Sequence, residues 1–308
     1  MARVFVTRQL PFPAFEQLAA VHETEVWDED RPVPSDVLHD QAAHSEGLLT
    51  MVTDHVGATL FDTAPALKVV ANYGVGYDNI DLRAAAAHGV LVGNTPDVLT
   101  EATADITWAL LLAAARRIVP SSREARIEWP SWRPDGHIGA DVHGATLAVV
   151  GNGRIGRAVA RRAIGFDMQV IVVSSKDPLV PALAQADFVS LHTPLTGATR
   201  HLIDAQALGA MKPTAILVNT ARGGIVDQAA LATALRAGTI GGAAIDVTDP
   251  EPLPADDPLW QAPNLLVTPH IGSATRSARA GMAQIAVDNL LAGIAGTPLP
   301  HPVPLPAL

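Results

Sequence analysis

The sequence has no cysteine among its 308 residues. This absence excludes disulfide bonds, thiolate nucleophiles and zinc sites built from cysteine, and it is compatible with the cytoplasm, where we expect the protein. No apolar run is long enough for a membrane helix, since the longest covers only residues 108–115. The N-terminus predicts a first strand instead of a secretion signal. We therefore expect no membrane partner.

Basic residues are scarce relative to acidic ones. The chain has 21 Lys and Arg against 31 Asp and Glu, for a net charge of −10. Because nucleic-acid binding needs clustered Lys and Arg, this balance argues against a nucleic-acid partner. The one short basic cluster, at 154–162, directly follows a glycine-rich loop. The length favours two domains, and 48% hydrophobic residues are typical of a globular protein.

What the sequence does contain is an alternation of short β-rich runs and helical patterns, which predicts an α/β fold with parallel sheets and crossover helices. Long helices are expected at 102–117 and 276–291, a loop at 129–144, and an extended Pro-rich tail at 296–308. In the first hundred residues we expect strands at 3–7, 47–53, 67–72 and 90–93, with helices at 12–20 and 82–87. In the second series we expect strands at 146–150, 169–173, 188–191, 216–219, 242–246 and 265–267.

A glycine-rich loop stands between the first strand of the second series and the helix after it. Gly151, Gly153 and Gly156 follow the spacing G-x-G-x-x-G, and this context makes the motif indicative of dinucleotide binding. The three glycines would form a tight turn, admit a pyrophosphate and allow the helix to pack on the strand. The alternative is a strand-to-helix turn with no ligand.

The end of the next strand bears on the choice of dinucleotide. NAD-binding units place an acid there to bind the ribose hydroxyls, whereas this strand ends in Ser174, Ser175 and Lys176. Two hydroxyls and an ammonium suit a 2′-phosphate, so the sequence favours NADP(H) over NAD(H). In the competing interpretation, Asp177 binds the ribose and the serines only shape the turn.

Three further charged residues follow predicted strands, where α/β sheets place active sites. Arg222 follows the strand at 216–219, Glu251 the strand at 242–246, and His270 the strand at 265–267. Hydride transfer to a keto acid needs a cation for the carboxylate, a proton donor for the carbonyl oxygen, and an acid that holds the donor imidazole. Arg, His and Glu supply these three functions.

Long motifs over most of the chain resemble the D-isomer-specific 2-hydroxyacid dehydrogenases, most closely the glyoxylate/hydroxypyruvate reductases. The motifs keep the family's order along the chain. They are NYGVGYDNID (72–81), NTPDVLTEATAD (94–105), GNGRIGRAVA (151–160), SLHTPLTGATRHLI (190–203), MKPTAILVNTARGGIVD (211–227), IDVTDPEP (245–252) and TPHIGSAT (268–275).

The resemblance implies the NAD(P)H-dependent reduction of a small 2-keto acid, glyoxylate or hydroxypyruvate, to the D-2-hydroxy acid. It makes Arg222 the carboxylate ligand, His270 the proton donor and Glu251 the partner that favours protonated His270. The substrate residues it implies are Leu48, Thr50, Ser273 and the amides of Val75 and Gly76. The positions it implies for the dinucleotide are Thr103, Arg154, Ile155, His192, Pro194, Thr199, Thr220, Ala221, Asp246 and Gly272, beside the glycine loop.

The same resemblance implies two Rossmann-like or flavodoxin-like parallel-sheet domains, with the nucleotide-binding domain inserted in the substrate domain. We expect residues 1–98 and 281–308 to form the substrate domain and 99–280 the Rossmann domain. It also implies a homodimer, in which a Trp of the 129–144 loop reaches the neighbouring subunit, and chemistry without a metal. Packing within the chain is an equally open role for Trp129 and Trp132.

Two substrate and function alternatives stay open. Larger 2-keto acids, such as 2-ketogluconate or arylpyruvates, depend on loops that the sequence does not place. A dinucleotide-sensing, corepressor-like protein is the non-enzymatic alternative, and the presence of Arg222, Glu251 and His270 disfavours it. Glu251 argues against formate dehydrogenase, which has Gln there, and Val75 against phosphite dehydrogenase, which has Lys.

The chain departs from its family between residues 175 and 184, where it is shorter. The usual third strand of the nucleotide sheet and much of the next helix are missing, since KDPLVPALAQAD leads almost directly to the strand at 188–191. We therefore expect a trimmed sheet edge beside the adenine end of the cofactor.

Overall fold

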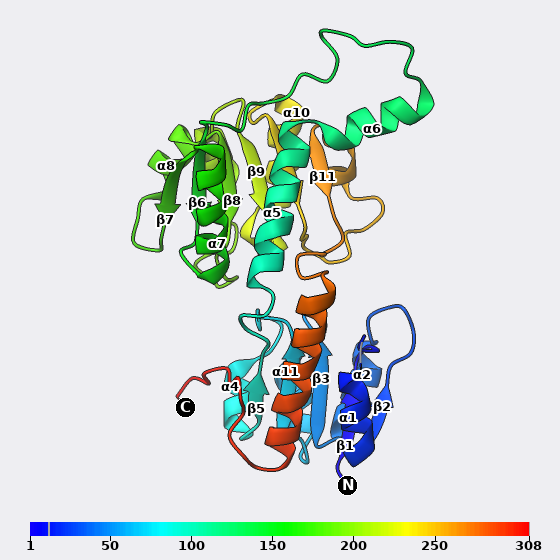
Figure 1. The fold of residues 1–308 in the computed structure, drawn as a ribbon. Helices are drawn as coiled ribbons and strands as arrows, with labels where there is room; N and C mark the ends of the chain where they lie inside the picture. The colour runs from blue at the N-terminus through cyan, green and yellow to red at the C-terminus, as the bar shows by residue number, and fades with distance from the viewer. Residues whose placement is uncertain (12, 308) are drawn as a thin grey trace. The chain divides into compact units, whose positions relative to one another are not determined.

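The computed structural model describes residues 1–11 and 13–307. The chain divides into two compact units, one formed by residues 1–99 with 274–308 and the other by residues 100–273. Each unit is built on a parallel sheet with helices on both faces (Figure 1). The predicted α/β fold with two parallel-sheet domains is confirmed.

The first unit, drawn in blue and cyan with its last helix in orange-red (Figure 1), has a five-stranded sheet in the order β2-β1-β3-β4-β5. This is the flavodoxin-like order, in which ligands bind beyond the carboxyl ends of the strands. The elements are β1 (Arg3–Val6), α1 (Ala14–Val21), β2 (Glu23–Val26), α2 (Ser35–Ala43), β3 (Gly47–Met51), α3 (Ala58–Thr63), β4 (Val69–Tyr73), α4 (Leu82–Ala87), β5 (Leu91–Gly93) and α11 (Arg276–Ile294).

Helix α11 returns the chain to this unit and lies against β3 and β4, beside α1. Small residues allow the close approach, because a Cβ on Gly293 would lie 2.5 Å from the side chain of Val69. The C-terminal tail joins the core on the other face, where Val303 is buried and its N–H donates to the carbonyl of Val92. The expected helix at 12–20 corresponds to α1, while Phe12 and Leu308 lie outside the described residues.

The second unit has a six-stranded sheet in the order β11-β10-β9-β8-β6-β7. Its elements are α5 (Thr100–Ala115), α6 (Ile118–Ile127), β6 (Thr146–Val150), α7 (Arg154–Ala163), β7 (Gln169–Val173), α8 (Leu179–Gln185), β8 (Phe188–Leu191), α9 (Ala205–Ala210), β9 (Ile216–Asn219), α10 (Gln228–Ala237), β10 (Gly242–Ile245) and β11 (Leu265–Val267), with short 3₁₀ turns at Ile164–Phe166, Gly223–Ile225 and Pro258–Gln261.

The strands of this sheet alternate between two apolar cores, as the period of two in a strand requires. Leu147 and Val149 of β6 face α5 and α7, whereas Ala148 and Val150 face α8, α9 and α10. Both faces are covered, so the strands are mostly apolar instead of alternating with polar residues, and the polar Ser190 and Asn219 are buried. Trp108 of α5 stacks on Phe166 with ring centroids 4.7 Å apart, which fixes this helix on the face that carries α7.

Two elements were not expected from the sequence. Strand β2 (Glu23–Val26) reads ETEV and lies at a sheet edge, so it lacks the apolar run that marks a buried strand. Helix α6 (Ile118–Ile127) has no buried residue, and Figure 1 shows it and the following loop extending away from the sheet of its unit. Its apolar residues therefore pack into no core within the single chain.

The trimmed sheet edge is confirmed in the described part of the second unit. Strand β7 pairs with β6 alone and forms the edge, and the seven-residue α8 leads directly into β8. A doubly wound nucleotide sheet has a further strand beyond this position.

Candidate active site

Three charged residues follow three neighbouring strands of the second unit. Arg222 lies beyond β9, Glu251 beyond β10 and His270 beyond β11. Because β9, β10 and β11 pair in parallel, their carboxyl ends lie at one edge of the sheet, the edge at which open α/β sheets bind ligands.

The structure brings His270 and Glu251 into direct contact. The imidazole Nδ1 lies 2.9 Å from Oε1 of Glu251, and both side chains are about one quarter exposed. An Nδ1–H that donates to the carboxylate fixes the orientation of the ring. The Nε2 atom is then the nitrogen that can exchange a proton with a ligand.

The backbone of His270 adopts the left-handed conformation, with φ of 51°. This conformation costs a residue with a side chain roughly 1–3 kcal/mol, and it persists where surrounding contacts impose it. Here the N–H of His270 donates to the carbonyl of Asp246 over 2.9 Å. The backbone therefore adds a second constraint, besides Glu251, on where the imidazole lies.

Arg222 is held by a turn that depends on Asn219, a residue that sequence reasoning missed. Asn219 is buried at the end of β9, donates from Nδ2 to the carbonyl of Arg222 over 2.8 Å and accepts from the N–H of Ala221. The guanidinium of Arg222 donates to the carbonyl of Ala221. A buried amide at the end of an otherwise apolar strand is the signal that could have identified Asn219.

The three glycines of the loop after β6 differ in what surrounds them. Gly151 has φ of 111°, and a Cβ there would lie 2.5 Å from the carbonyl oxygen of His192. A Cβ on Gly156 would lie 2.0 Å from the carbonyl oxygen of Gly151, whereas a Cβ on Gly153 would meet nothing within 4 Å. Gly151 and Gly156 are therefore required by the fold, and Gly153 leaves open space at the start of α7.

Helix α7 begins directly after Gly153, with Arg154 and Ile155 in its first turn. No side chain caps this N-terminus, and its first turn contains no acidic residue. Uncapped N–H groups and the positive end of the helix dipole attract a phosphate, and the open space at Gly153 would admit one. The residues present thus fit the pyrophosphate of a dinucleotide.

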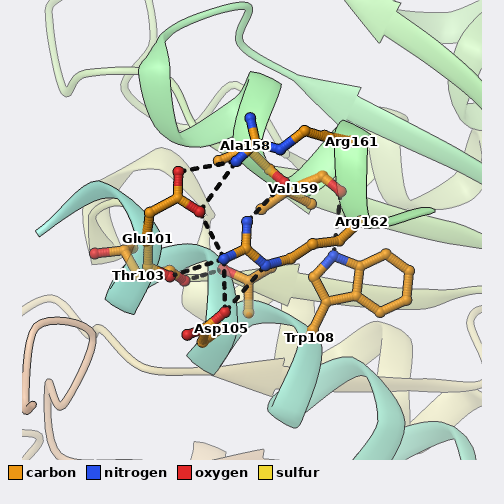
Figure 2. Close-up of polar contacts among 9 residues, drawn as sticks. Glu101, Thr103, Asp105, Trp108, Ala158, Val159, Arg161 and Arg162 are labelled. Carbon is orange, nitrogen blue, oxygen red and sulfur yellow. Dashed lines mark hydrogen bonds and ion pairs between the residues drawn. The ribbon is translucent and has the colours of Figure 1, made fainter. Parts of the chain in front are cut away.

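An ion-pair network joins α7 to α5 (Figure 2). The guanidinium of Arg162 contacts Glu101 and Asp105 at 2.7 Å each, and Arg161 contacts Glu101 at 2.9 Å. These bonds hold the pKa of Glu101 below its ordinary value. Arg161 and Arg162, which belong to the basic cluster at 154–162, therefore link α7 to α5.

Thr103, Asp246 and Gly272 lie close together beside the backbone of His270. A Cβ on Gly272 would lie 3.2 Å from Oδ2 of Asp246 and 3.7 Å from the methyl carbon of Thr103. Thr220 is linked to them through Thr107, whose hydroxyl contacts the Thr220 hydroxyl at 2.8 Å and donates to the carbonyl of Thr103. Four positions expected at the dinucleotide are thus connected in space.

Asp246 is a buried carboxyl with one engaged oxygen. Oδ1 accepts from the Thr268 hydroxyl over 2.5 Å and from the Ile271 N–H over 2.9 Å, while the buried Oδ2 has no hydrogen bond of good geometry among the described residues. Burial raises the pKa of Asp246, and the bond from Thr268 opposes that shift. Oδ2 therefore has only the N–H of Gly272 nearby and can accept a well-formed hydrogen bond from a ligand.

His192 and Pro194 lie on the loop after β8, opposite Gly151. The ring Nε2 of His192 lies 2.7 Å from the Ser190 hydroxyl, and desolvation lowers the pKa of His192 to about 3, so the ring is neutral. Thr199 folds this loop by donating from its hydroxyl to the carbonyl of Pro194 over 2.6 Å.

The turn after β7 contains a carboxylate contact. Oδ2 of Asp177 accepts from the hydroxyl of Ser174 over 2.5 Å and from its backbone N–H over 2.8 Å. The bond from the Ser174 hydroxyl, followed by that from its N–H, lowers the pKa of Asp177. Ser174 is thus engaged within the turn, while Ser175 and Lys176 are exposed.

In the first unit, the loop of Gly74, Val75 and Gly76 is supported through its carbonyl groups. The carbonyl of Gly74 accepts from the Thr95 N–H over 2.9 Å, that of Val75 from the Asn94 amide over 2.8 Å, and that of Gly76 from the Asn72 amide over 2.7 Å. In a trans peptide the N–H points opposite to the C=O. The N–H groups of Val75 and Gly76 therefore point away from these supports.

Thr50 belongs to the same network, because its hydroxyl donates to Oδ1 of Asn72 over 3.1 Å. Leu48, two residues earlier on β3, is fully buried in the core of the first unit. Sequence reasoning missed Asn72 and Asn94, although both belong to the quoted motifs. Ser273, the last residue of the second unit, is half-buried.

Residues 1–11 and 13–307 contain neither a metal-binding cluster nor a membrane-spanning helix. Within them, no group of three or more His, Cys, Asp or Glu side chains could hold a metal ion. No helix of this part of the chain has the length and hydropathy needed to cross a membrane.

Comparison with known proteins places these features in context. Residues 108–272 match the model of the D-isomer specific 2-hydroxyacid dehydrogenase NAD-binding domain. Two glyoxylate reductases are each 45% identical, from Korarchaeum cryptofilum over 305 residues and from Thermococcus kodakarensis over 308, and both alignments cover 94% of this chain and 92% of the relative.

Solved structures are also similar. A protein of Thermus thermophilus superposes with a TM-score of 0.92 at 48% identity, covering 98% of this chain and all of that one. An NADPH-dependent glyoxylate/hydroxypyruvate reductase of Sinorhizobium meliloti, in complex with NADP and malonate, superposes with a TM-score of 0.85 at 32% identity, covering 98% of this chain and 96% of its own.

Proposed function

Because the chain belongs to the D-isomer-specific 2-hydroxyacid dehydrogenase family, we propose that it reduces glyoxylate or hydroxypyruvate to the D-2-hydroxy acid with NADPH. The observation that carries the proposal is the contact of His270 with Glu251 at 2.9 Å, at the sheet edge that also bears Arg222. This set supplies a proton donor and a carboxylate ligand in one place. The glyoxylate reductases that are 45% identical over most of the chain support the same substrate class.

The proposed reaction uses the three residues as follows. Arg222 binds and orients the carboxylate of the keto acid, as its planar guanidinium is suited to do. A dinucleotide held by the glycine loop and the start of α7 would supply the hydride for the carbonyl carbon. Nε2 of His270 supplies a proton to the carbonyl oxygen. Glu251 holds the imidazole through Nδ1 while this proton leaves, and a proton from solvent restores the imidazolium afterwards. For the first unit by itself, we propose the amides of Val75 and Gly76 as donors to a carboxylate.

The dinucleotide itself fits the second unit at two points. The glycine loop and the uncapped start of α7 would hold the pyrophosphate. Oδ2 of Asp246 would accept from the carboxamide N–H₂ of the nicotinamide, which is a donor of the kind this oxygen lacks.

We assign the preference for NADP(H) to Ser175 and Lys176. Both are exposed at the end of β7, where an ammonium and a hydroxyl can meet a 2′-phosphate. Ser174, included in this group on sequence grounds, already donates to Asp177, so it contributes less than expected. The Sinorhizobium meliloti structure in complex with NADP supports the preference.

A panel of 2-keto acids tests the proposal. Glyoxylate, hydroxypyruvate, 2-ketogluconate and phenylpyruvate are assayed with NADPH and NADH in parallel. The highest kcat/KM is expected with glyoxylate or hydroxypyruvate and NADPH. A preference for a larger acid, or for NADH, would contradict that part of the proposal, and turnover that is weak on every acid and unaffected by His270→Ala would contradict enzymatic function.

We also propose a homodimer, the common state of the family, with α6 and the following loop as the contact. Their apolar side chains are strongly exposed in the single chain: Ile127 is 87% exposed, Trp129 76% and Trp132 79%. Apolar side chains that are this exposed and adjacent indicate a surface that a partner covers. Sedimentation should give a dimer at micromolar concentration, and a monomer would contradict the proposal.

A further inference from the structure

The segment that carries Glu251 has no regular structure of its own. Residues 247–253 lie between β10 and the 3₁₀ turn at Pro258–Gln261 and belong to no helix or strand. A general acid's partner has to be placed within a fraction of an ångström, which an unsupported loop does not achieve. The structure therefore has to fix this segment through side chains.

Gln228 provides that support from the first turn of α10. Its Nε2 donates to the carbonyl of Asp249 over 2.6 Å, and its Oε1 accepts from the N–H of Asp249 over 2.9 Å. One primary amide thus satisfies both backbone groups of a single residue, as the neighbouring strand of a sheet would do. Asp249 precedes Glu251 by two residues, so this pairing fixes the backbone directly before the carboxylate.

The residue that makes these bonds is itself rigidly placed. Asp227 caps α10 by accepting from the N–H of Ala230 over 2.9 Å, and the helix buries Leu231, Ala232 and Leu235 in the core of the unit. A side chain at the start of a capped and buried helix is a fixed point from which to hold a loop.

Asp249 also makes contact with the segment that follows Arg222. A Cβ on Gly223 would lie 2.5 Å from the backbone nitrogen of Asp249 and 2.0 Å from the carbonyl carbon of Thr248. The side chain of Asp249 accepts from Arg200 over 3.1 Å. Asp249 is thus where the loops bearing Arg222 and Glu251 touch, and Gln228 is the side chain that holds both backbone groups of Asp249.

We propose that Gln228 is a positioning residue for the proton transfer, which places Glu251 against His270 through its paired hydrogen bonds to the backbone of Asp249. The inference rests on the proposed function, because it concerns the proton that His270 delivers. Gln228 contacts neither the imidazole nor, in this assignment, the substrate. The proposal makes Glu251 the residue through which Gln228 acts on proton transfer, and an effect that disappears when Glu251 is changed distinguishes it from a residue that merely stabilises the fold.

The test is a double-mutant cycle on kcat for glyoxylate reduction with NADPH. Gln228→Met keeps the length of the side chain and the helix propensity and removes both hydrogen bonds. We expect Glu251→Gln to lower kcat by about 100-fold and Gln228→Met by about 10-fold, since a misplacement of about 1 Å can cost up to about 100-fold. In the Glu251→Gln background, Gln228→Met should change kcat by less than about 2-fold, because residues that act as a unit are not additive.

Two controls separate positioning from general stability. Gln185→Met, on α8, removes a single bond to the helix's own carbonyl of Pro181 and should leave kcat unchanged. Dinucleotide Kd, from quenching of protein fluorescence, and Tm should match the unmodified protein in both variants. Gln228 and Asp249 are partly exposed, so the loss of their bonds costs little stability.

A readout independent of turnover is hydrogen exchange at the amides of Asp249 and Glu251, measured by NMR. Gln228→Met should speed exchange at Asp249 by at least about 10-fold relative to Gln185→Met, because the Asp249 N–H loses its acceptor. Equal exchange in the two variants overturns the inference whatever the activity. An unchanged kcat in the Gln228→Met variant also overturns the inference. So does a double variant whose loss of kcat equals the product of the losses in the two single variants. If Glu251→Gln itself leaves kcat unchanged, the proposed function fails instead.

Discussion

The two ends of the sheet in the second unit are built very differently. At the β9–β11 end, buried side chains surround the charged residues: Asn219 folds the turn of Arg222, and the backbone of Asp246 holds His270. At the other end, β7 pairs with β6 alone, and the exposed turn after it is held by Asp177 and the Ser174 hydroxyl. The chain has shortened the second end and kept the first.

In the proposed function the two ends have different tasks. Proton and hydride transfer require groups placed to within fractions of an ångström, so each group needs several supports. The adenosine end of a dinucleotide contributes binding free energy that does not depend on such precise placement. A chain can therefore lose a strand beside the adenine and keep its chemistry, with affinity for the cofactor as the quantity that falls.

The largest expected effect belongs to the catalytic end. His270→Gln should lower kcat for glyoxylate reduction by about 1,000-fold, because positioned proton donors contribute about 100- to 10,000-fold. Dinucleotide Kd, measured by fluorescence quenching, should stay within about 2-fold, since the ring faces the substrate in the proposed site. Equal losses in kcat and in dinucleotide affinity would contradict this prediction, because they would show that one residue at the β9–β11 end controls both quantities.

A matched pair of glycine variants tests the loop between the two ends. Gly153→Ala should weaken dinucleotide binding by about 10-fold or more and leave Tm unchanged, because its Cβ would occupy only the open space at α7. Gly156→Ala should instead cost about 1–3 kcal/mol of stability, since its Cβ meets the carbonyl of Gly151. Fluorescence titration and calorimetry on both variants decide, and the reverse pattern would refute the assignment of the open space to phosphate.

At the trimmed end, Asp177→Asn addresses the choice of dinucleotide. Removing a negative charge beside Lys176 should raise the ratio of kcat/KM for NADPH over NADH by about 5- to 10-fold, as expected for a 2′-phosphate freed from a like charge. If Asp177 binds the ribose of NADH, the same change lowers kcat/KM for NADH strongly and leaves NADPH unaffected. Ser175→Ala is the matched control and should lower only the NADPH value.

The smallest effect concerns stability at the catalytic end. Burial raises the pKa of Asp246 in the folded state, so the folded protein binds more protons than the unfolded chain just above the ordinary Asp pKa of 3.8. Stability therefore falls as pH rises from that value through the raised folded pKa, and the cost of the buried charge is fully present above that folded pKa. Asp246→Asn should raise Tm at pH 7 by a few degrees, about 1 kcal/mol, and flatten its pH dependence.

Calorimetry between pH 4 and pH 8 checks this prediction. The same variant should bind the dinucleotide more weakly, because the carboxamide loses its charged acceptor. A Tm that is lower at pH 7 than that of the unmodified protein would show that the Thr268 and Ile271 bonds outweigh the burial of the charge.

Sequence patterns located most of the strands and the long helices because their apolar runs reflect burial on both sheet faces. They missed β2, whose edge position leaves it polar, and α6, whose apolar residues face outward in the single chain. In the candidate site, Arg222, Glu251 and His270 were predicted from the chemistry of the reaction and from the family motifs. Asn219, Asn72, Asn94 and Gln228 were not found. Asn94 and Gln228 bond to backbone 19 and 21 residues away, which leaves no local sequence signature. Asn219 and Asn72 bond to backbone within four residues, and an amide in an otherwise apolar strand was the signal there.

The glycine spacing, the absent cysteines, the shortened segment after Ser175 and the order of the charged residues along the chain were determined by the sequence alone. Each is a local property of neighbouring residues. Tertiary structure decided which groups meet: that His270 touches Glu251 at 2.9 Å, that Ser174 is engaged by Asp177, and that one amide on α10 holds the backbone of Asp249. The first and last of these contacts join residues 19 and 21 positions apart, which the packing of strands and helices brings together and no local pattern encodes. The bond between Ser174 and Asp177 spans three residues, and the fold of the turn after β7 decides it.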